Sequence, residues 1–142
     1  MTGAEDDAEA GRFRLTVYYE DTDLAGIVYY ANYLKFIERA RSEALRRLGI
    51  DQTTLRAETG LVFAVRRVVV DYLAPARFED RLLVTTAVAA VGGARAELVQ
   101  EVRRGDALLV RAEVTVVCLG PDGRPARLPG PVRAALGRLA AG

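Results

Sequence analysis

The stretch from Tyr18 to Ile50 constrains the fold of this chain more than any other part of the sequence. It joins the end of a strand-like run, a loop with three acidic residues and one glycine, and a long segment with helical periodicity. The N-terminus of a helix concentrates free backbone N–H groups and a partial positive charge. A loop that brings carboxylates to such a helix can therefore place a base beside oxyanion donors, which makes this stretch the candidate active site.

The periodic segment predicts one long amphipathic helix from about residue 31 to residue 48. Charged side chains occupy much of its remaining surface, and Gly49 follows directly, as is common at a helix C-terminus. A helix of this kind must bury its stripe against another layer. The stripe recurs at steps of three and four residues and consists of Tyr33, Leu34, Ile37, Ala40, Arg41, Ala44, Leu45 and Leu48.

Strand-like runs surround the helix in sequence. One precedes it at Phe13–Tyr19, and four follow at residues 61–73, 81–91, 94–104 and 107–120, joined in part by glycine-containing hairpin turns. Between them, residues 51–60 predict a short helical turn at most, and residues 129–141 a short terminal helix. The pattern predicts an α+β fold in which one long central helix is wrapped by a curved five-stranded antiparallel sheet. The uncovered sheet face and edge strands favour an oligomer over a monomer.

Composition limits the chemistry. The chain contains no histidine, which excludes Ser-His-Asp and Cys-His catalysis, and its single cysteine, Cys118, cannot supply a zinc site. Cys118 lies on an apolar strand face and is expected to be core. The formal charge of +1 argues against nucleic-acid or anionic-membrane binding driven by net charge. Catalysis must therefore rest on carboxylates, hydroxyls, arginines and backbone groups.

The length of 142 residues predicts one domain, over residues 12–142, after a disordered acidic tail over residues 1–11. The N-terminus resembles no secretory signal, and no apolar run reaches membrane-spanning length. One unpaired cysteine favours a reducing compartment. We therefore expect a cytoplasmic protein without membrane insertion.

The segment VYYEDTDLAGIVYYANYLKFIERAR resembles the signature of the hotdog-fold acyl-CoA thioesterases of the 4-hydroxybenzoyl-CoA thioesterase type, and most closely the Tol-Pal-associated, YbgC-like members. The downstream segment RRVVVDYLAPARFEDRLLV is similar to the same subgroup. The resemblance implies the same arrangement of helix and curled sheet. It also implies homodimers with a continuous sheet, commonly paired into homotetramers, that bind CoA at subunit interfaces.

Site residues follow from the resemblance position by position. Asp23 matches the catalytic carboxylate of the family, and the backbone N–H of Tyr30 matches the group that polarises the thioester carbonyl. Tyr30 stands where the YbgC-like subgroup usually has histidine. A backbone donor survives that exchange, whereas any role of the imidazole is lost, so substrate preference is expected to differ.

Further residues are candidates for binding substrate. Thr22 is placed to position water or Asp23, and Gly26 to allow a tight backbone path near the thioester. Asp21 is expected to shape the loop through backbone hydrogen bonds. Another branch of hotdog thioesterases, which this chain also resembles, has its catalytic Glu on the long helix, where Glu38 lies here. We expect Glu38 to be solvated or ion-paired instead. The acyl pocket is assigned to Tyr29 and Tyr33, for which plain core packing is the alternative, and the CoA phosphates to Arg67, Arg95 and Arg103.

The sequence thus predicts an acyl-CoA thioesterase that releases a free acid and CoA without metal or redox cofactor. Asp23 acts as nucleophile or general base, and both roles stay open. A hotdog hydratase would need a histidine, which the chain lacks. The alternative of a different class is a non-catalytic module that binds acyl-CoA or acyl carrier protein in association with envelope machinery.

Overall fold

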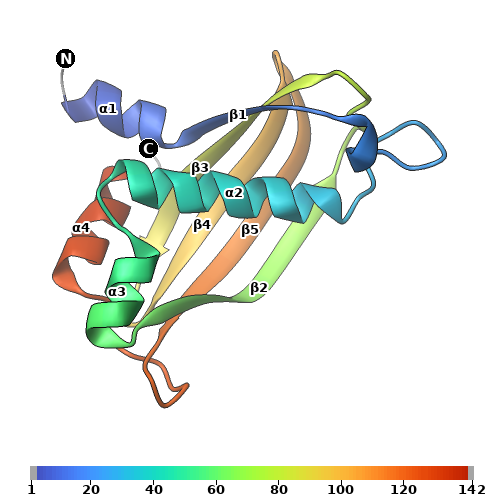
Figure 1. The fold of residues 1–142 in the computed structure, drawn as a ribbon. Helices are drawn as coiled ribbons and strands as arrows, with labels where there is room; N and C mark the ends of the chain where they lie inside the picture. Colours follow the sequence, from blue (N-terminus) through green and yellow to red (C-terminus); the bar gives the residue numbers. More distant parts are fainter. Residues whose placement is uncertain (1–2, 141–142) are drawn as a thin grey trace.

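The computed structural model describes residues 3–140. Its sheet has five antiparallel strands in the order β1-β3-β4-β5-β2, and it stays open (Figure 1). Register shifts lie between Val65 and Arg67 in β2 and between Val88 and Ala90 in β3. Such bulges bend strands, in keeping with the strong curvature of the sheet. The strands are β1 (Arg12–Thr16), β2 (Val62–Tyr72), β3 (Arg81–Val91), β4 (Arg95–Arg104) and β5 (Ala107–Leu119).

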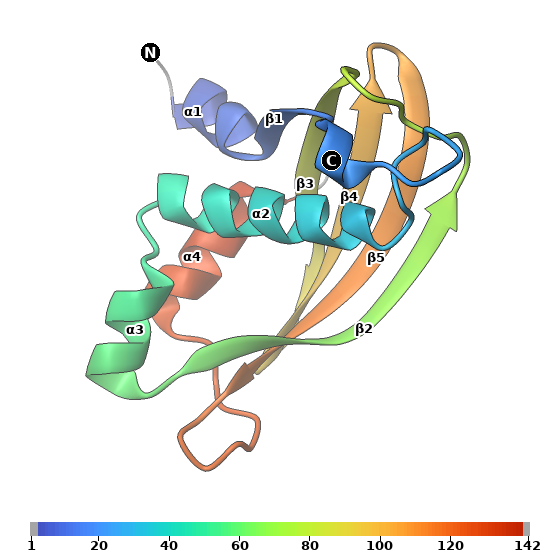
Figure 2. The same ribbon diagram turned by 45° about the vertical axis from the view of Figure 1, so that its right-hand side comes forward.

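The helix α2 (Asn32–Arg47) crosses the concave face of this sheet (Figures 1 and 2). It packs on β1, β3 and β4. Its buried side chains fall on one stripe, and Gly49 ends the segment in a left-handed conformation with φ of +90°. The predicted α+β fold, a long helix wrapped by a curved five-stranded antiparallel sheet, is confirmed. The buried residues of α2 are Tyr33, Phe36, Ile37, Ala40 and Ala44.

A disordered tail was expected over residues 1–11, but residues 3–10 form the helix α1 (Gly3–Ala10), and residues 1–2 lie outside the described residues. Residues distant in sequence hold this helix. The Arg138 guanidinium pairs with the Asp7 carboxylate at 2.6 Å, and Arg47 donates to the Glu9 carbonyl at 3.1 Å. Ala10 is buried. The composition of this segment indicated disorder because it cannot show contacts with Arg47 and Arg138, which form only in the folded chain.

Two further helices cover the end of the sheet away from the N-terminus of α2. Residues expected to make a turn at most form α3 (Gln52–Thr59), where Asp51 accepts hydrogen bonds from the Thr53 and Thr54 N–H groups at 2.9 and 3.2 Å. The expected terminal helix is α4 (Gly130–Arg138). Its apolar side packs on β3, and Figure 2 shows α3 and α4 side by side at this end. The strand β2 forms a long edge of the sheet, since it pairs only with β5.

Candidate active site

The loop between β1 and α2 carries Asp23 at the first position of a tight turn. The Asp23 N–H donates to the Ile27 carbonyl and the Gly26 N–H to the Asp23 carbonyl, each at 3.0 Å. Gly26 has φ of +78°, the left-handed conformation that glycine adopts without strain. A bridge between Ile27 and Arg77 ties the turn to the β2–β3 connection. The turn is therefore held by backbone bonds on both sides.

One oxygen of the Asp23 carboxylate is used within the turn. Its Oδ1 atom accepts the Ala25 N–H at 2.9 Å, whereas Oδ2 accepts no hydrogen bond from residues 3–140. The side chain is exposed to solvent in the single chain. Asp23 is thus oriented through one oxygen and presents the other, the arrangement that a base or nucleophile requires.

Asp21 and Thr22 shape the same loop. The Asp21 carboxylate accepts the Tyr18 N–H at 2.8 Å, and its carbonyl accepts the Tyr29 N–H at 2.9 Å and the Asn32 side-chain amide at 3.0 Å. The Thr22 hydroxyl donates to the Tyr19 carbonyl at 2.7 Å. The loop-shaping role expected for Asp21 is therefore present in the structure, and the Thr22 hydroxyl is engaged within a turn.

Two backbone donors lie at the start of α2. Hydrogen bonds inside the first turn begin with the N–H groups of Asn32, Tyr33 and Leu34. The N–H groups of Tyr30 and Ala31 donate to no acceptor within the described part of the chain. Unpaired N–H groups and the positive end of the helix dipole together favour a developing negative charge at this point.

An aromatic cluster surrounds these donors. Ring centroids lie 4.9 Å apart for Tyr29 and Tyr30, 6.0 Å for Tyr30 and Tyr72, and 5.8 Å for Tyr33 and Tyr72. The Tyr29 and Tyr30 side chains are 46% and 61% exposed, so both can meet a ligand. The neighbouring Tyr30 hydroxyl raises the pKa of Tyr29 by hydrogen bonding and charge, so the Tyr29 phenol is neutral at physiological pH.

Tyr33 has a different position from Tyr29. It is only 3% exposed, and its hydroxyl accepts the Ala76 N–H at 3.0 Å. Burial raises its pKa. Tyr33 is therefore a buried residue that packs in the core, which fits the alternative of plain core packing considered for it. Tyr72 was not singled out from the sequence, although an aromatic residue closing a strand directly before Leu-Ala-Pro was a usable signal.

The three arginines assigned to the CoA phosphates lie in different parts of the sheet and do not form one cluster. Arg95 opens β4 at one end of the sheet and pairs with Glu97 at 3.7 Å. Arg103 lies near the opposite end of β4 and binds the Glu101 carboxylate at 3.0 Å. Arg67 is exposed at the bulge of β2. Of the three, only Arg103 lies at the sheet end that holds Tyr72 and the Asp23 loop.

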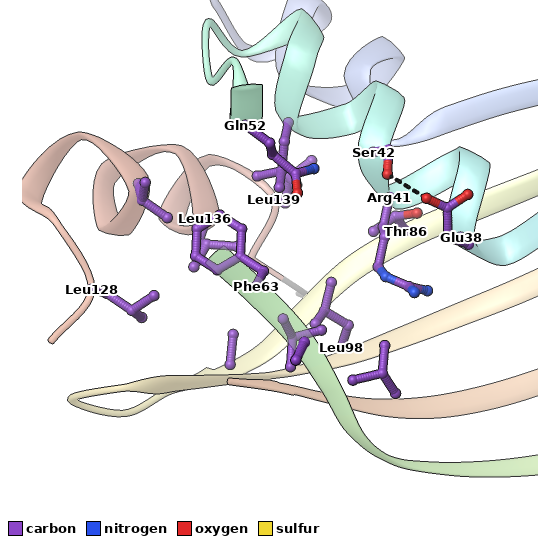
Figure 3. Close-up of a pocket in the computed structure, with 16 residues that line it drawn as sticks. Glu38, Arg41, Ser42, Gln52, Phe63, Thr86, Leu98, Leu128, Leu136 and Leu139 are labelled. Atoms are coloured by element: carbon purple, nitrogen blue, oxygen red, sulfur yellow. Dashed lines mark hydrogen bonds between the residues drawn. The ribbon is translucent and has the colours of Figure 1, made fainter. Parts of the chain in front are cut away.

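A separate cavity of about 200 Å³ lies farther along α2 (Figure 3). Helix α2 provides Glu38, Arg41 and Ser42 to its wall, and most of the remaining wall is apolar. Neither Asp23 nor Tyr30 lines it. The Glu38 carboxylate accepts a hydrogen bond from the Ser42 hydroxyl at 3.0 Å.

Residues 3–140 contain no cluster of three or more His, Cys, Asp and Glu side chains that could hold a metal ion. Among the same residues, none of the helices is both long enough and apolar enough to cross a membrane. The burial of Cys118 raises the pKa of its thiol, in keeping with a core position.

Comparison with known proteins identifies relatives of this chain. The family model described as "Thioesterase superfamily" matches residues 25–115. The acyl-CoA thioesterase YbgC of Haemophilus influenzae is 43% identical over 129 residues, covering 89% of this chain and 94% of that protein. The acyl-CoA thioester hydrolase YbgC of Escherichia coli is 43% identical over 111 residues, covering 78% and 82%.

Solved structures agree with the sequence relatives. A probable thioesterase from Bartonella henselae has a TM-score of 0.80 at 37% identity, covering 83% of this chain and 98% of that one. A 1,4-dihydroxy-2-naphthoyl-CoA thioesterase from Synechocystis has a TM-score of 0.82 at 27% identity, covering 89% and 94%. The chain therefore belongs to the thioesterase superfamily, has YbgC proteins among its relatives, and is a thioesterase enzyme of the hotdog fold.

Proposed function

We propose that the protein hydrolyses an acyl-CoA thioester to a free carboxylic acid and CoA, with Asp23 as the reacting carboxylate and the Tyr30 N–H as the oxyanion donor. The observation that carries the proposal is that one ordered loop holds both a carboxylate oxygen and a backbone N–H group without hydrogen-bond partners in the described part of the chain. The Asp23 Oδ2 atom and the Tyr30 N–H both lack a partner among residues 3–140. The activities named for the YbgC relatives support acyl-CoA as the substrate class.

Two routes are consistent with this geometry. As a general base, Asp23 takes a proton from water while the water oxygen bonds to the thioester carbon. The tetrahedral oxyanion accepts hydrogen bonds at the start of α2, then collapses as the carbon–sulfur bond breaks and the CoA sulfur takes the proton that Asp23 had accepted. As a nucleophile, Asp23 itself bonds to the carbon, CoA leaves, and water cleaves the resulting anhydride. Neither route uses a metal or redox cofactor.

The test is release of thiol from a panel of acyl-CoAs by the purified protein. The proposal expects one equivalent each of CoA and free acid, and a protein that binds acyl-CoAs without releasing thiol would contradict it. Single-turnover hydrolysis in ¹⁸O-labelled water detects the nucleophilic route when water attacks the Asp23 carbonyl of the anhydride. Unlabelled acid in the first turnover requires an acyl–Asp23 intermediate, because the acid then takes its second oxygen from Asp23.

A homodimer is the proposed working unit. The edge strand β2 runs for 11 residues and presents an apolar row, with Val62, Val65, Val68 and Val69 each 36–42% exposed. A long apolar edge with unpaired backbone groups favours pairing with another strand, and a second copy of β2 would continue the sheet.

Acyl carrier protein is a second candidate acyl donor beside CoA.

Dimers of this kind are proposed to pair into a homotetramer. Light scattering measures the assembly directly. A monomer mass at micromolar concentration would contradict the proposal. The Val68→Lys protein is expected to shift the mass toward the monomer, since a charge on the inner face of an edge strand opposes pairing.

A further inference from the structure

The cavity beside α2 contains a cation that the protein leaves largely unpaired. Arg41 extends from the helix into the space between α2 and the sheet (Figure 3). Its guanidinium makes one side-chain hydrogen bond, to the Gln100 Oε1 atom at 3.3 Å. No carboxylate of residues 3–140 lies within 4.0 Å of it. A guanidinium has five N–H donors, so most of those on Arg41 have no acceptor among residues 3–140.

Apolar side chains form most of the cavity wall, and Glu38, Ser42, Gln52 and Thr86 are its other polar members. The opposite walls of the cavity are formed by side chains such as Phe63, Leu98 and Val116. Burial lowers the pKa of Arg41, and the charge of nearby Glu38 opposes that effect only in part. The Glu38 carboxylate also lines the cavity, but it accepts the Ser42 hydroxyl and lies more than 4.0 Å from the guanidinium, so Arg41 keeps N–H donors that an anion can fill.

Gln100 fixes the direction of this cation. The Gln100 side chain is fully buried, and its Nε2 atom donates to the Ile37 carbonyl at 2.8 Å and to the Thr86 hydroxyl at 2.9 Å. With both donors committed, the Oε1 atom is left as the acceptor for Arg41. The network spans α2, β3 and β4, so the guanidinium is oriented before any ligand arrives.

The cavity lies along the helix from the proposed reacting groups. Arg41 follows Tyr30 by 11 positions, which is about 16 Å along a helix axis at 1.5 Å per residue. Leu34, Glu38 and Arg41 fall near one helical face, and Leu34 is 41% exposed. A linear chain that starts at the N-terminus of α2 can follow this face toward the cavity.

We propose that the Arg41 cavity binds the distal end of the acyl chain and that the preferred acyl group ends in a carboxylate. This inference rests on the proposed hydrolysis at Asp23, because the thioester end must lie at the start of α2. The volume of about 200 Å³ is close to that of a cavity which holds one benzene ring, about 150 Å³. It therefore takes the end of a chain, and a carboxylate there can form two parallel N–H···O bonds with Arg41.

The test compares acyl-CoAs of equal length that differ only in the terminal carboxylate. The pairs are suberyl-CoA with octanoyl-CoA and dodecanedioyl-CoA with dodecanoyl-CoA. For at least one pair, we expect the wild-type kcat/KM to be about tenfold higher with the carboxylate, the scale of one charge-assisted bond. The Arg41→Met protein should lose this ratio, and Arg41→Lys, which keeps the charge without the fork, should retain part of it.

Arg39→Met is the matched control, since Arg39 lies exposed on the same helix. It should keep the wild-type ratio. A wild-type preference for the uncharged chain in both pairs would overturn the inference, and so would an Arg41→Met protein that keeps the ratio. The wild-type comparison decides the matter even where a variant fails to fold.

A binding measurement separates this inference from the proposed function. Free suberate and dodecanedioate are probes that need no hydrolysis. At least one should raise the Tm of the wild type and of Arg39→Met, but not that of Arg41→Met. A protein that shows this shift but releases no thiol from any acyl-CoA would refute the hydrolysis and keep the anion site. A protein that hydrolyses acyl-CoAs without an Arg41-dependent shift or ratio would refute the site alone.

Discussion

The Tyr72 hydroxyl, at the end of β2, donates a hydrogen bond to the Tyr30 carbonyl over 3.3 Å. The two residues are 42 positions apart in sequence, and their rings meet edge to face with centroids 6.0 Å apart. The Tyr30 carbonyl and N–H flank one Cα atom, so a bond that holds the carbonyl also restricts the proposed oxyanion donor. Burial raises the pKa of Tyr72, which keeps its hydroxyl protonated near neutral pH.

Removing this hydroxyl should loosen the donor without disturbing the aromatic cluster. The Tyr72→Phe protein keeps the ring but loses the bond to the Tyr30 carbonyl. We expect kcat to fall by up to about tenfold, because one neutral hydrogen bond contributes about 1 kcal/mol. Steady-state thiol release measures the effect. An unchanged kcat in a folded Tyr72→Phe protein would show that this contact does not position Tyr30.

The donor at Tyr30 is assigned to the backbone, so its side chain and its N–H can be tested apart. Tyr30→Phe and Tyr30→His keep the N–H and should retain kcat within about tenfold. Tyr30→Pro removes the N–H at a position before the helix where proline is tolerated, and kcat should fall about 10²–10³-fold. Circular dichroism checks that α2 persists. If Tyr30→Phe loses as much activity as Tyr30→Pro, the donor is not the backbone group.

Gly26 is required for its conformation and not for space. A Cβ atom there would meet nothing within 4 Å, but φ of +78° costs an L-residue about 1–2 kcal/mol. Gly26→Ala should therefore lower the free energy of unfolding by about that amount in urea titrations. Gly93→Ala is the matched control, since its Cβ would also meet nothing within 4 Å and its φ is not left-handed. Equal losses in both proteins would contradict this account.

Asp80 should make stability depend on pH under acidic conditions. Its carboxylate accepts the Arg77 N–H and an Arg104 N–H, both at 2.8 Å. Partial burial acts to raise the pKa of Asp80, but these bonds and charges outweigh it and hold the pKa below the usual 3.8. Because the folded-state pKa is depressed, the stabilisation is present above pH 3.8 and is lost as the pH falls through the folded-state value.

The Asp80→Asn protein should accordingly unfold more easily than wild type at pH 7, by about 1 kcal/mol. The difference should shrink as the pH falls below the unfolded-state value. Urea titrations at neutral and acidic pH measure it, with Asp106→Asn as an exposed turn control. A difference of the same size at both pH values would exclude titration of Asp80 as the cause.

The main helices and strands were predictable from the sequence because their buried side chains recur at a regular spacing within each segment. The stripe of α2 has period 3.6, and β3 was placed at residues 81–91 as observed. The length of the helix α3 was underestimated because only Leu55 and Ala57 interrupt its polar run, although Asp51 and Gly60 supplied both caps. The helix α1 depends on Arg47 and Arg138, which only the folded chain brings near it.

The site was predictable only where neighbours in sequence build it. Asp23 and Tyr30 share one loop, so a motif could propose them together. Tyr72 joins them through the sheet, and strand patterns could not indicate which end of the sheet would hold Arg95. Arg41 did leave a signal, since a cation on the apolar stripe of a helix must face either a partner or a cavity.

The role of Asp23 as the reacting carboxylate is tested by measuring kcat for the Asp23→Asn and Glu20→Gln proteins. Asparagine keeps the oxygen that accepts the Ala25 N–H, so the turn and the Tm should be retained. Glu20 is a neighbouring exposed carboxylate that serves as the matched control. Asp23→Asn should lose at least about 10²-fold in kcat on every acyl-CoA that wild type hydrolyses, while Glu20→Gln should keep the wild-type rate. A folded Asp23→Asn protein with the wild-type kcat would contradict this role of Asp23.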